Sequence, residues 1–245
     1  MGKQLRRFGR TSTPETRVAV AAATLMVAGQ IATAEPARRI DIFVEPFYRS
    51  ATNPSDQPQV SVGRKFDALL ASNRREDILA ARDLIVADPK LVTPMTMMVL
   101  AIRLYDMGLR DESVFWFYVA KDRYFTLVDV AVPNAPALAT ADDSMRSFAA
   151  LAGPFINGYA FCDLSRQQDA RARALAWVKA NPYQAIFLPQ IPARSSDREA
   201  ALAQALRQEE AGVEKERSYL QDPKNRQEFL DARKRNGADE RFCWK

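Results

Sequence analysis

The chain has 245 residues, 47% of them hydrophobic, which is enough apolar material for a buried core and excludes global disorder. Its formal net charge is +5, but residues 1–34 hold five basic side chains against the single acid Glu15, so about +1 remains for residues 35–245. Because binding to nucleic acid needs a concentrated basic face, we expect no nucleic-acid partner.

Residues 1–34 have the three parts of a secretory signal peptide. A basic stretch ends at Arg17, and residues 18–31 form an uncharged, mostly apolar run that is shorter than the ~20 residues needed to span a bilayer. The small-x-small pattern Ala32-Thr33-Ala34 follows. We therefore expect cleavage after Ala34 and a periplasmic or secreted protein that meets the membrane only transiently, during export. An uncleaved anchor and a short buried core helix are the alternatives.

Residues 35–60 are predicted to form an extended arm, with one short strand at 40–44 and no clear strand to pair with it. Helical spacing of apolar residues then predicts helices over 61–72 and 74–87. Thr93 is a good N-cap, with proline at the first helical position, for a helix that ends at Met107-Gly108.

The next helix opens at Arg110, and its aromatic run over 115–118 surrounds the helix, so we expect burial on more than one side. Further helices are predicted over 141–161, kinked or split at Gly153-Pro154, and over 166–180. A proline-rich linker spans 183–194. A long, charged surface helix over 196–220 and a shorter helix over 223–236 complete the chain.

The expected organisation is therefore an all-α protein with four parts. Residues 1–34 are the signal peptide and residues 35–60 the extended arm. Residues 61–182 form a helical-hairpin domain, and residues 183–245 supply the linker and C-terminal helices packed on that core.

The mature part holds both cysteines of the chain, Cys162 and Cys243. In an oxidising compartment such a pair favours a disulfide, which would tie the C-terminal tail to the body. The alternative is two unpaired thiols, with Cys162 buried. Two cysteines and no histidine argue against a metal site.

The segment Met97 to Ala120 carries large and small residues at a fixed helical spacing on both sides of a glycine turn, namely Met97, Leu100, Ala101, Leu104, Gly108, Asp111, Glu112, Ser113, Phe117 and Ala120. This pattern resembles a tetratricopeptide repeat, a helix–turn–helix unit of about thirty-four residues. The closing proline of the repeat is absent, because Phe125 stands there, and the rest of the chain matches weakly. The resemblance implies stacked antiparallel helical hairpins that bind another protein, and an ordinary antiparallel helix pair is the alternative.

Without histidine, Ser-His-Asp and Cys-His catalysis are excluded, and no glycine-rich phosphate loop occurs, so we expect no cofactor. Acid–base chemistry with carboxylates stays open. Glu112-Ser113 resembles the Glu-Ser pair of lytic transglycosylases, which cut peptidoglycan, but the residues that follow do not match. The structural interpretation of Glu112 is an acidic first turn that complements the helix dipole.

The residues Trp116, Tyr118, Lys121, Arg123 and Tyr124 mix rings with charges and are our candidate binding cluster. In the alternative interpretation the rings are core and the charges form a solvated last turn. We expect an exported, non-enzymatic helical protein that binds another protein in the periplasm or cell envelope, as an adaptor, assembly factor or inhibitor. The other hypotheses are a cell-wall glycan hydrolase and a structural module of an envelope complex.

Overall fold

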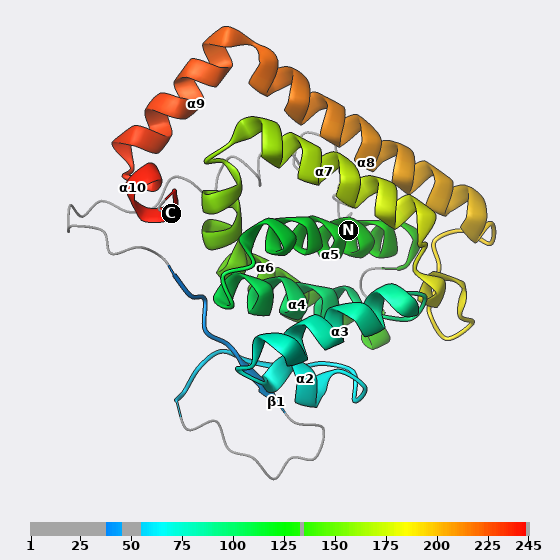
Figure 1. Cartoon of the computed structure of the whole chain (residues 1–245). Coiled ribbons are helices and arrows are strands. Elements are labelled where there is room, and N and C mark those ends of the chain that lie inside the picture. Colours follow the sequence, from blue (N-terminus) through cyan, green and yellow to red (C-terminus); the bar gives the residue numbers. More distant parts are fainter. Residues whose placement is uncertain (1–37, 46–54, 133–134, 244–245) are drawn as a thin grey trace, which may run out of the picture.

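The computed structural model describes residues 38–45, 55–132 and 135–243, which are almost entirely helical (Figure 1). The predicted all-α class is confirmed. The expected signal peptide and its cleavage site at Ala34 lie outside the described residues. Within the described ranges, no helix combines the length and apolar character that crossing a membrane requires.

A small parallel sheet begins the described chain. Strand β1 (Phe43–Glu45) pairs with β2 (Gln59–Ser61), so the predicted strand has a partner that we did not expect. Three residues, of which only Val60 is buried, are too few for a periodic signal in the sequence. The preceding segment is anchored to the helices, because the amide of Ile40 donates to Asp106 Oδ1 at 2.7 Å.

Two short helices follow this sheet. The helix predicted over 61–72 is reduced to α2 (Asp67–Ala71), because its first residue belongs to β2 and residues 62–66 form a loop and turn. Helix α3 (Arg75–Ala87) matches its prediction and ends before Asp88-Pro89.

The centre of the molecule is a hairpin of α4 (Pro94–Asp106) and α5 (Arg110–Val130). Thr93 caps α4 as predicted, accepting from the amide of Thr96 at 3.1 Å. Every residue of α4 except Met95 and Asp106 is buried. The turn needs glycine at position 108, where φ is +78°, a conformation that side chains disfavour. Helix α5 packs against α4, α6, α7 and α8, so burial on more than one side is confirmed.

Helix α6 (Pro136–Ala160) continues through Pro154 without interruption, so the predicted split is wrong. Proline removes one backbone hydrogen bond from a helix, and burial of the neighbouring Ala152 and Ile156 compensates for that loss. Helix α7 (Leu164–Ala180) begins at the cap Asp163 and ends at Asn181.

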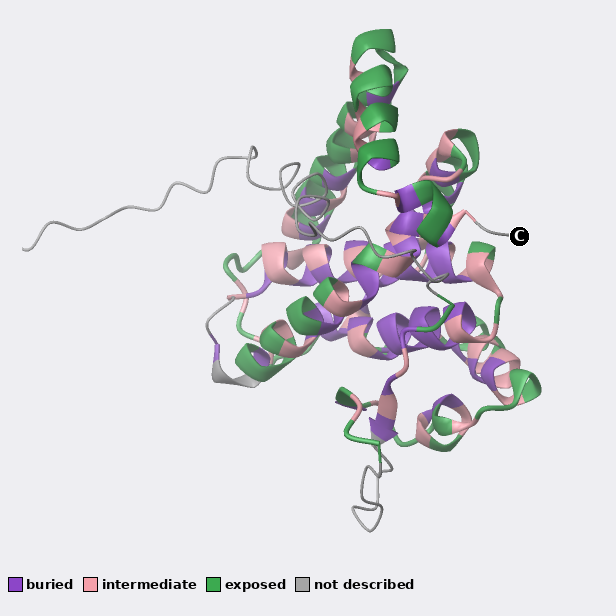
Figure 2. Ribbon diagram, turned by 90° about the vertical axis from the view of Figure 1, so that its left-hand side faces the viewer, coloured by how far each residue is buried: buried purple, intermediate pink, exposed green. Residues whose placement is uncertain are grey.

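The last three helices form what we call the C-terminal arch, residues 198–243. Helix α8 (Arg198–Gln221) runs along the outside of α7, α9 (Pro223–Arg235) turns back, and α10 (Ala238–Phe242), which we did not predict, reaches α6 (Figure 1). Between Glu209 and Arg233, all of which the structure describes, Leu220 is the one buried residue. The arch is therefore exposed in its middle and held at its ends (Figure 2).

Candidate functional site

The candidate binding cluster lies on α5, in the middle of the helical body. Trp116, Tyr118, Arg123 and Tyr124 are buried, and Lys121 is partly exposed. The surface that we expected from these side chains is therefore interior in this chain, because four helices surround α5. The residues of the cluster also do not form one site, because their side chains contact different neighbours.

Arg123 links two turns of the chain to helix α5 through hydrogen bonds. Its guanidinium donates to two carbonyl oxygens of the α3–α4 turn, at 2.6 and 2.9 Å, and to the carbonyl of Asn181 at 2.7 Å. It lies between the rings of Trp177 and Tyr183, 5.3 and 5.2 Å from their centroids. Burial lowers the pKa of Arg123 to about 10. These contacts pair both terminal nitrogens of the buried cation, while its Nε is buried without a hydrogen-bond partner. Arg123 therefore has a structural role, because it links both turns to α5.

A buried ionic network joins α5, α7 and α8. Asp122, fully buried, accepts from Arg171 Nη1, and Glu209 Oε2 lies 3.7 Å from Arg171 Nη2. Burial by itself would lower the pKa of Arg171, but the charge and hydrogen bond of Asp122 raise it above its ordinary value. A buried charge is tolerated when it is paired in this way, so the network fixes how the three helices pack.

The same network continues through neutral groups. Gln167 Nε2 donates to the hydroxyl of Tyr118 at 3.1 Å and to Glu216 Oε1 at 2.7 Å, and Tyr118 donates to Asn157 Oδ1 at 3.2 Å. Burial raises the pKa of Tyr118, so its hydroxyl stays protonated and able to donate. A cleft of about 270 Å³ lies beside this network between α7 and α8, with Arg171, Glu216 and Arg217 in its walls.

A second pocket, of about 230 Å³, lies where the start of α4, the end of α5 and the first half of α6 meet. Its polar feature is Tyr124, which donates to Asp142, and Asp142 also pairs with Arg146 at 3.0 Å. The remaining lining is largely apolar and includes Met95, Leu127, Leu138, Met145 and Ile191.

Glu112 stands in the first turn of α5, where its charge complements the helix dipole, and its side chain is 40% exposed. Its Oε2 accepts from Arg82 Nη1 at 2.9 Å, which ties α3 to α5. The geometry gives Glu112 a structural contact. Among the residues that the structure describes, no group of three or more potential ligands could hold a metal ion.

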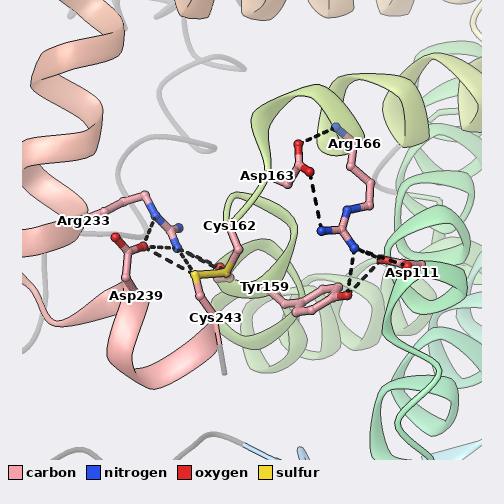
Figure 3. Close-up of a disulfide and its surroundings, with 9 residues drawn as sticks. Asp111, Tyr159, Cys162, Asp163, Arg166, Arg233, Asp239 and Cys243 are labelled. Atoms are coloured by element: carbon pink, nitrogen blue, oxygen red, sulfur yellow. Dashed lines mark hydrogen bonds and ion pairs between the residues drawn. A yellow bond between two sulfur atoms is a disulfide. The ribbon is translucent and has the colours of Figure 1, made fainter. Parts of the chain in front are cut away.

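The predicted disulfide is present. Cys162, just after α6, is bonded to Cys243, just after α10, with their Cα atoms 5.5 Å apart (Figure 3). Phe242 packs beside it, 6.2 Å from Phe155 between ring centroids. The ring lies directly over Gly158, where an added Cβ would come within 2.6 Å of it. A glycine is therefore needed for α10 to reach α6.

Arg233 completes this junction and was missed by the sequence analysis. It is 1% exposed; its Nε donates to Asp239 Oδ1 at 2.9 Å and its Nη2 to the carbonyl of Gly158 at 3.1 Å. In the sequence it opens the basic run 233–235, which looks like an ordinary solvated helix end. No local signal distinguishes it from its neighbours.

The fold and this junction define an all-helical protein with a disulfide-closed C-terminal arch. No family model and no solved structure match the chain. It is 34% identical over 210 residues to an uncharacterized protein of Haemophilus influenzae, a match that covers 86% of this chain and 81% of that protein. The chain belongs to the same family as this Haemophilus protein.

Proposed function

We propose that the mature chain is an exported, non-enzymatic protein that binds another protein in the periplasm or cell envelope. The C-terminal arch is its contact surface, and a folded envelope protein is the partner. The observation that carries this proposal is an arch that is exposed along its middle and fixed at both ends.

Export is supported by two independent features. The signal-peptide pattern of residues 1–34 is one, and the Cys162–Cys243 disulfide is the other. Disulfides persist in oxidising compartments and are rare in the cytosol. Both features point to a location outside the cytosol.

Binding through the arch is supported by its composition and by the helical order of its segments. Tyr219 on α8 is 50% exposed and Leu230 on α9 is 36% exposed. Tyrosine is enriched among the residues that dominate interfaces. A surface whose helices are already ordered binds without the entropy cost of ordering them.

The α4–α5 hairpin supports a tetratricopeptide-like scaffold behind this surface. The small residues Ala101 and Ala120 are fully buried, and Ser113 Oγ donates to the carbonyl of Ala101 at 2.7 Å, so the two helices approach closely. The glycan-hydrolase alternative has less support, because Glu112 is ion-paired with Arg82.

Photo-crosslinking in intact cells tests the contact surface. A photoreactive amino acid replaces Tyr219 or Leu230 in the arch, or Val86 or Leu91 as controls, which are 54% and 60% exposed and lie on α3 and just beyond it. We expect one discrete protein adduct from the arch positions and none from the controls. Absence of an adduct at both arch positions, or equal adducts at all four, would contradict the proposal.

Fractionation tests the location separately. We expect the full chain, expressed with its own N-terminus, in the periplasmic fraction, shortened after Ala34, and oxidised on a non-reducing gel. A chain that keeps its first thirty-four residues and is recovered reduced in the cytosol would overturn the export part alone.

A further inference from the structure

A buried cation lies against the disulfide. Arg233 Nη2 is 3.3 Å from Cys243 Sγ and 3.7 Å from Cys162 Sγ (Figure 3). The guanidinium therefore contacts both sulfur atoms, in addition to the carbonyl of Gly158 and the carboxylate of Asp239.

The charge has a chemical consequence. A disulfide is cleaved when a thiolate attacks one sulfur and the other leaves as a thiolate, and a nearby cation stabilises that leaving group. Asp239 pairs with Arg233 at 2.8 Å, and its Oδ1 also lies 3.5 Å from Cys243 Sγ, so it offsets part of the positive charge at that sulfur. Its side chain is 50% exposed, whereas that of Arg233 is 1% exposed. Solvent screens the carboxylate more strongly than the guanidinium, so the cation dominates at the sulfur atoms.

The disulfide is also within reach. Cys162 and Cys243 are both partly exposed. The buried guanidinium contacts the sulfur atoms from within the protein. A thiol can therefore approach from solution while the cation stays in place.

We propose that the Cys162–Cys243 bond is a thiol-exchange site whose reaction partner is a thiolate, borne by a small molecule or a redox protein. The incoming thiolate forms a new S–S bond to one cysteine, the Cys162–Cys243 bond breaks, and its electron pair leaves on the other cysteine beside Arg233. A second thiolate attacks the mixed disulfide and leaves both cysteines reduced and the two thiols joined. The exchange removes the covalent tie between α10 and α6, and the Arg233–Gly158 hydrogen bond remains to keep the cation beside the two thiols. This proposal goes beyond protein binding and does not depend on it.

The rate of cleavage tests the role of Arg233. The oxidised full chain is incubated with reduced glutathione at neutral pH, and free thiols are counted by an alkylation mobility shift. We expect cleavage in Arg233→Met to be about three- to tenfold slower than in the unaltered chain. A purely structural arginine predicts the opposite, because loosening the junction exposes the bond. Equal or faster cleavage in the variant overturns the proposal.

A matched control and a second thiol sharpen the result. Lys234→Met removes the adjacent, exposed cation and should leave the rate unchanged. A parallel series with a protein dithiol of the thioredoxin type distinguishes the two sources of thiolate. A faster reaction with the protein dithiol assigns a redox-protein partner, and a faster reaction with glutathione assigns a small thiol.

A measurement on the unaltered chain keeps the proposal testable if Arg233→Met does not fold. The reduced chain is alkylated with iodoacetamide across a pH series. The midpoint of the rate profile should fall below the value of about 8.5 that an ordinary thiol shows. A midpoint at or above that value overturns the proposal.

Discussion

The α4–α5 hairpin and the C-terminal arch are held in place by different means. Almost all of α4 is buried, and α5 is surrounded by four other helices, so the hairpin is secured by apolar contacts spread over its length. The arch has one buried residue between Glu209 and Arg233, and is attached at its end by the disulfide, Arg233 and Phe242.

This contrast predicts two kinds of stability. Distributed burial makes a segment unfold together with the whole domain, whereas a segment held at a few points opens locally. Removing one contact should therefore weaken the whole protein when the contact lies in the hairpin, and mainly the arch when it lies at the junction. Four substitutions test that difference, starting with the largest expected effect.

Leu100→Ala should destabilise the whole protein by about 3–5 kcal/mol, because it empties a fully buried site in α4. Urea unfolding followed by circular dichroism measures the loss. Val86→Ala, at a site 54% exposed on α3, is the control and should change stability by less than about 0.5 kcal/mol. Similar losses of stability from both substitutions would contradict the assignment of Leu100 to the core and Val86 to the surface.

Cys243→Ser should lower the free energy of local opening of the C-terminal arch by up to about 4 kcal/mol, because the bond closes a long loop. We expect the change to appear as faster amide hydrogen exchange in α9 and α10, with exchange in α4 unaltered. Cys162→Ser should give the same result. The double variant should show no larger loss of stability than either single variant, because all three lack the same bond. Uniformly faster exchange through α4 would show that the arch and the hairpin form one cooperative unit.

Gly158→Ala should destabilise the junction by about 1–3 kcal/mol, because the new Cβ would lie 2.6 Å from the Phe242 ring. Gly212→Ala in α8 is the matched control, since nothing lies within 4 Å of its added Cβ. Alanine favours a helix, so the control should gain about 0.5–1 kcal/mol. Thermal unfolding measures the stability of both variants. A gain of stability in both would contradict the observed packing of Phe242 on Gly158.

Asp106→Asn should have the smallest effect on stability. The effect should be visible in how the stability of the protein changes with pH. Burial raises the pKa of Asp106, although the Ile40 amide and Arg103 lower it. The folded state therefore holds this proton more tightly than the unfolded state, and that stabilisation is complete below about pH 4 and lost as the pH rises through the raised pKa. In urea unfolding, the variant should gain stability relative to the unaltered chain as the pH rises from about 4 through the raised pKa of Asp106. A difference that is constant with pH would contradict the assignment.

Much of the helical pattern could be predicted from residue spacing. Thr93 caps α4, Asn181-Pro182 ends α7, and α8 occupies the expected span. These features depend on local rules of capping and periodicity that need no distant partner. Strand β2 and helix α10 were missed because each is only a few residues long and is stabilised by contacts far away in the sequence.

The candidate site was predicted less well, because it too depends on contacts between residues far apart in the sequence. The disulfide partners followed from cysteine counting, but the candidate cluster on α5 is buried rather than exposed. Residue type cannot say whether Tyr118 or Arg123 faces solvent, because amphipathic side chains occur in both places.

By itself, the sequence determined that the fold is helical, where Thr93 begins α4 and Asn181 ends α7, and that only one pair of cysteines is available for a disulfide. Only the tertiary structure decided that Arg233 contacts both sulfur atoms, and that α6, α7 and α8 enclose the charged face of α5. The physical reason is range: capping and periodicity act within a turn or two of a helix. Burial of a charge depends on groups that the chain brings together from tens of residues away.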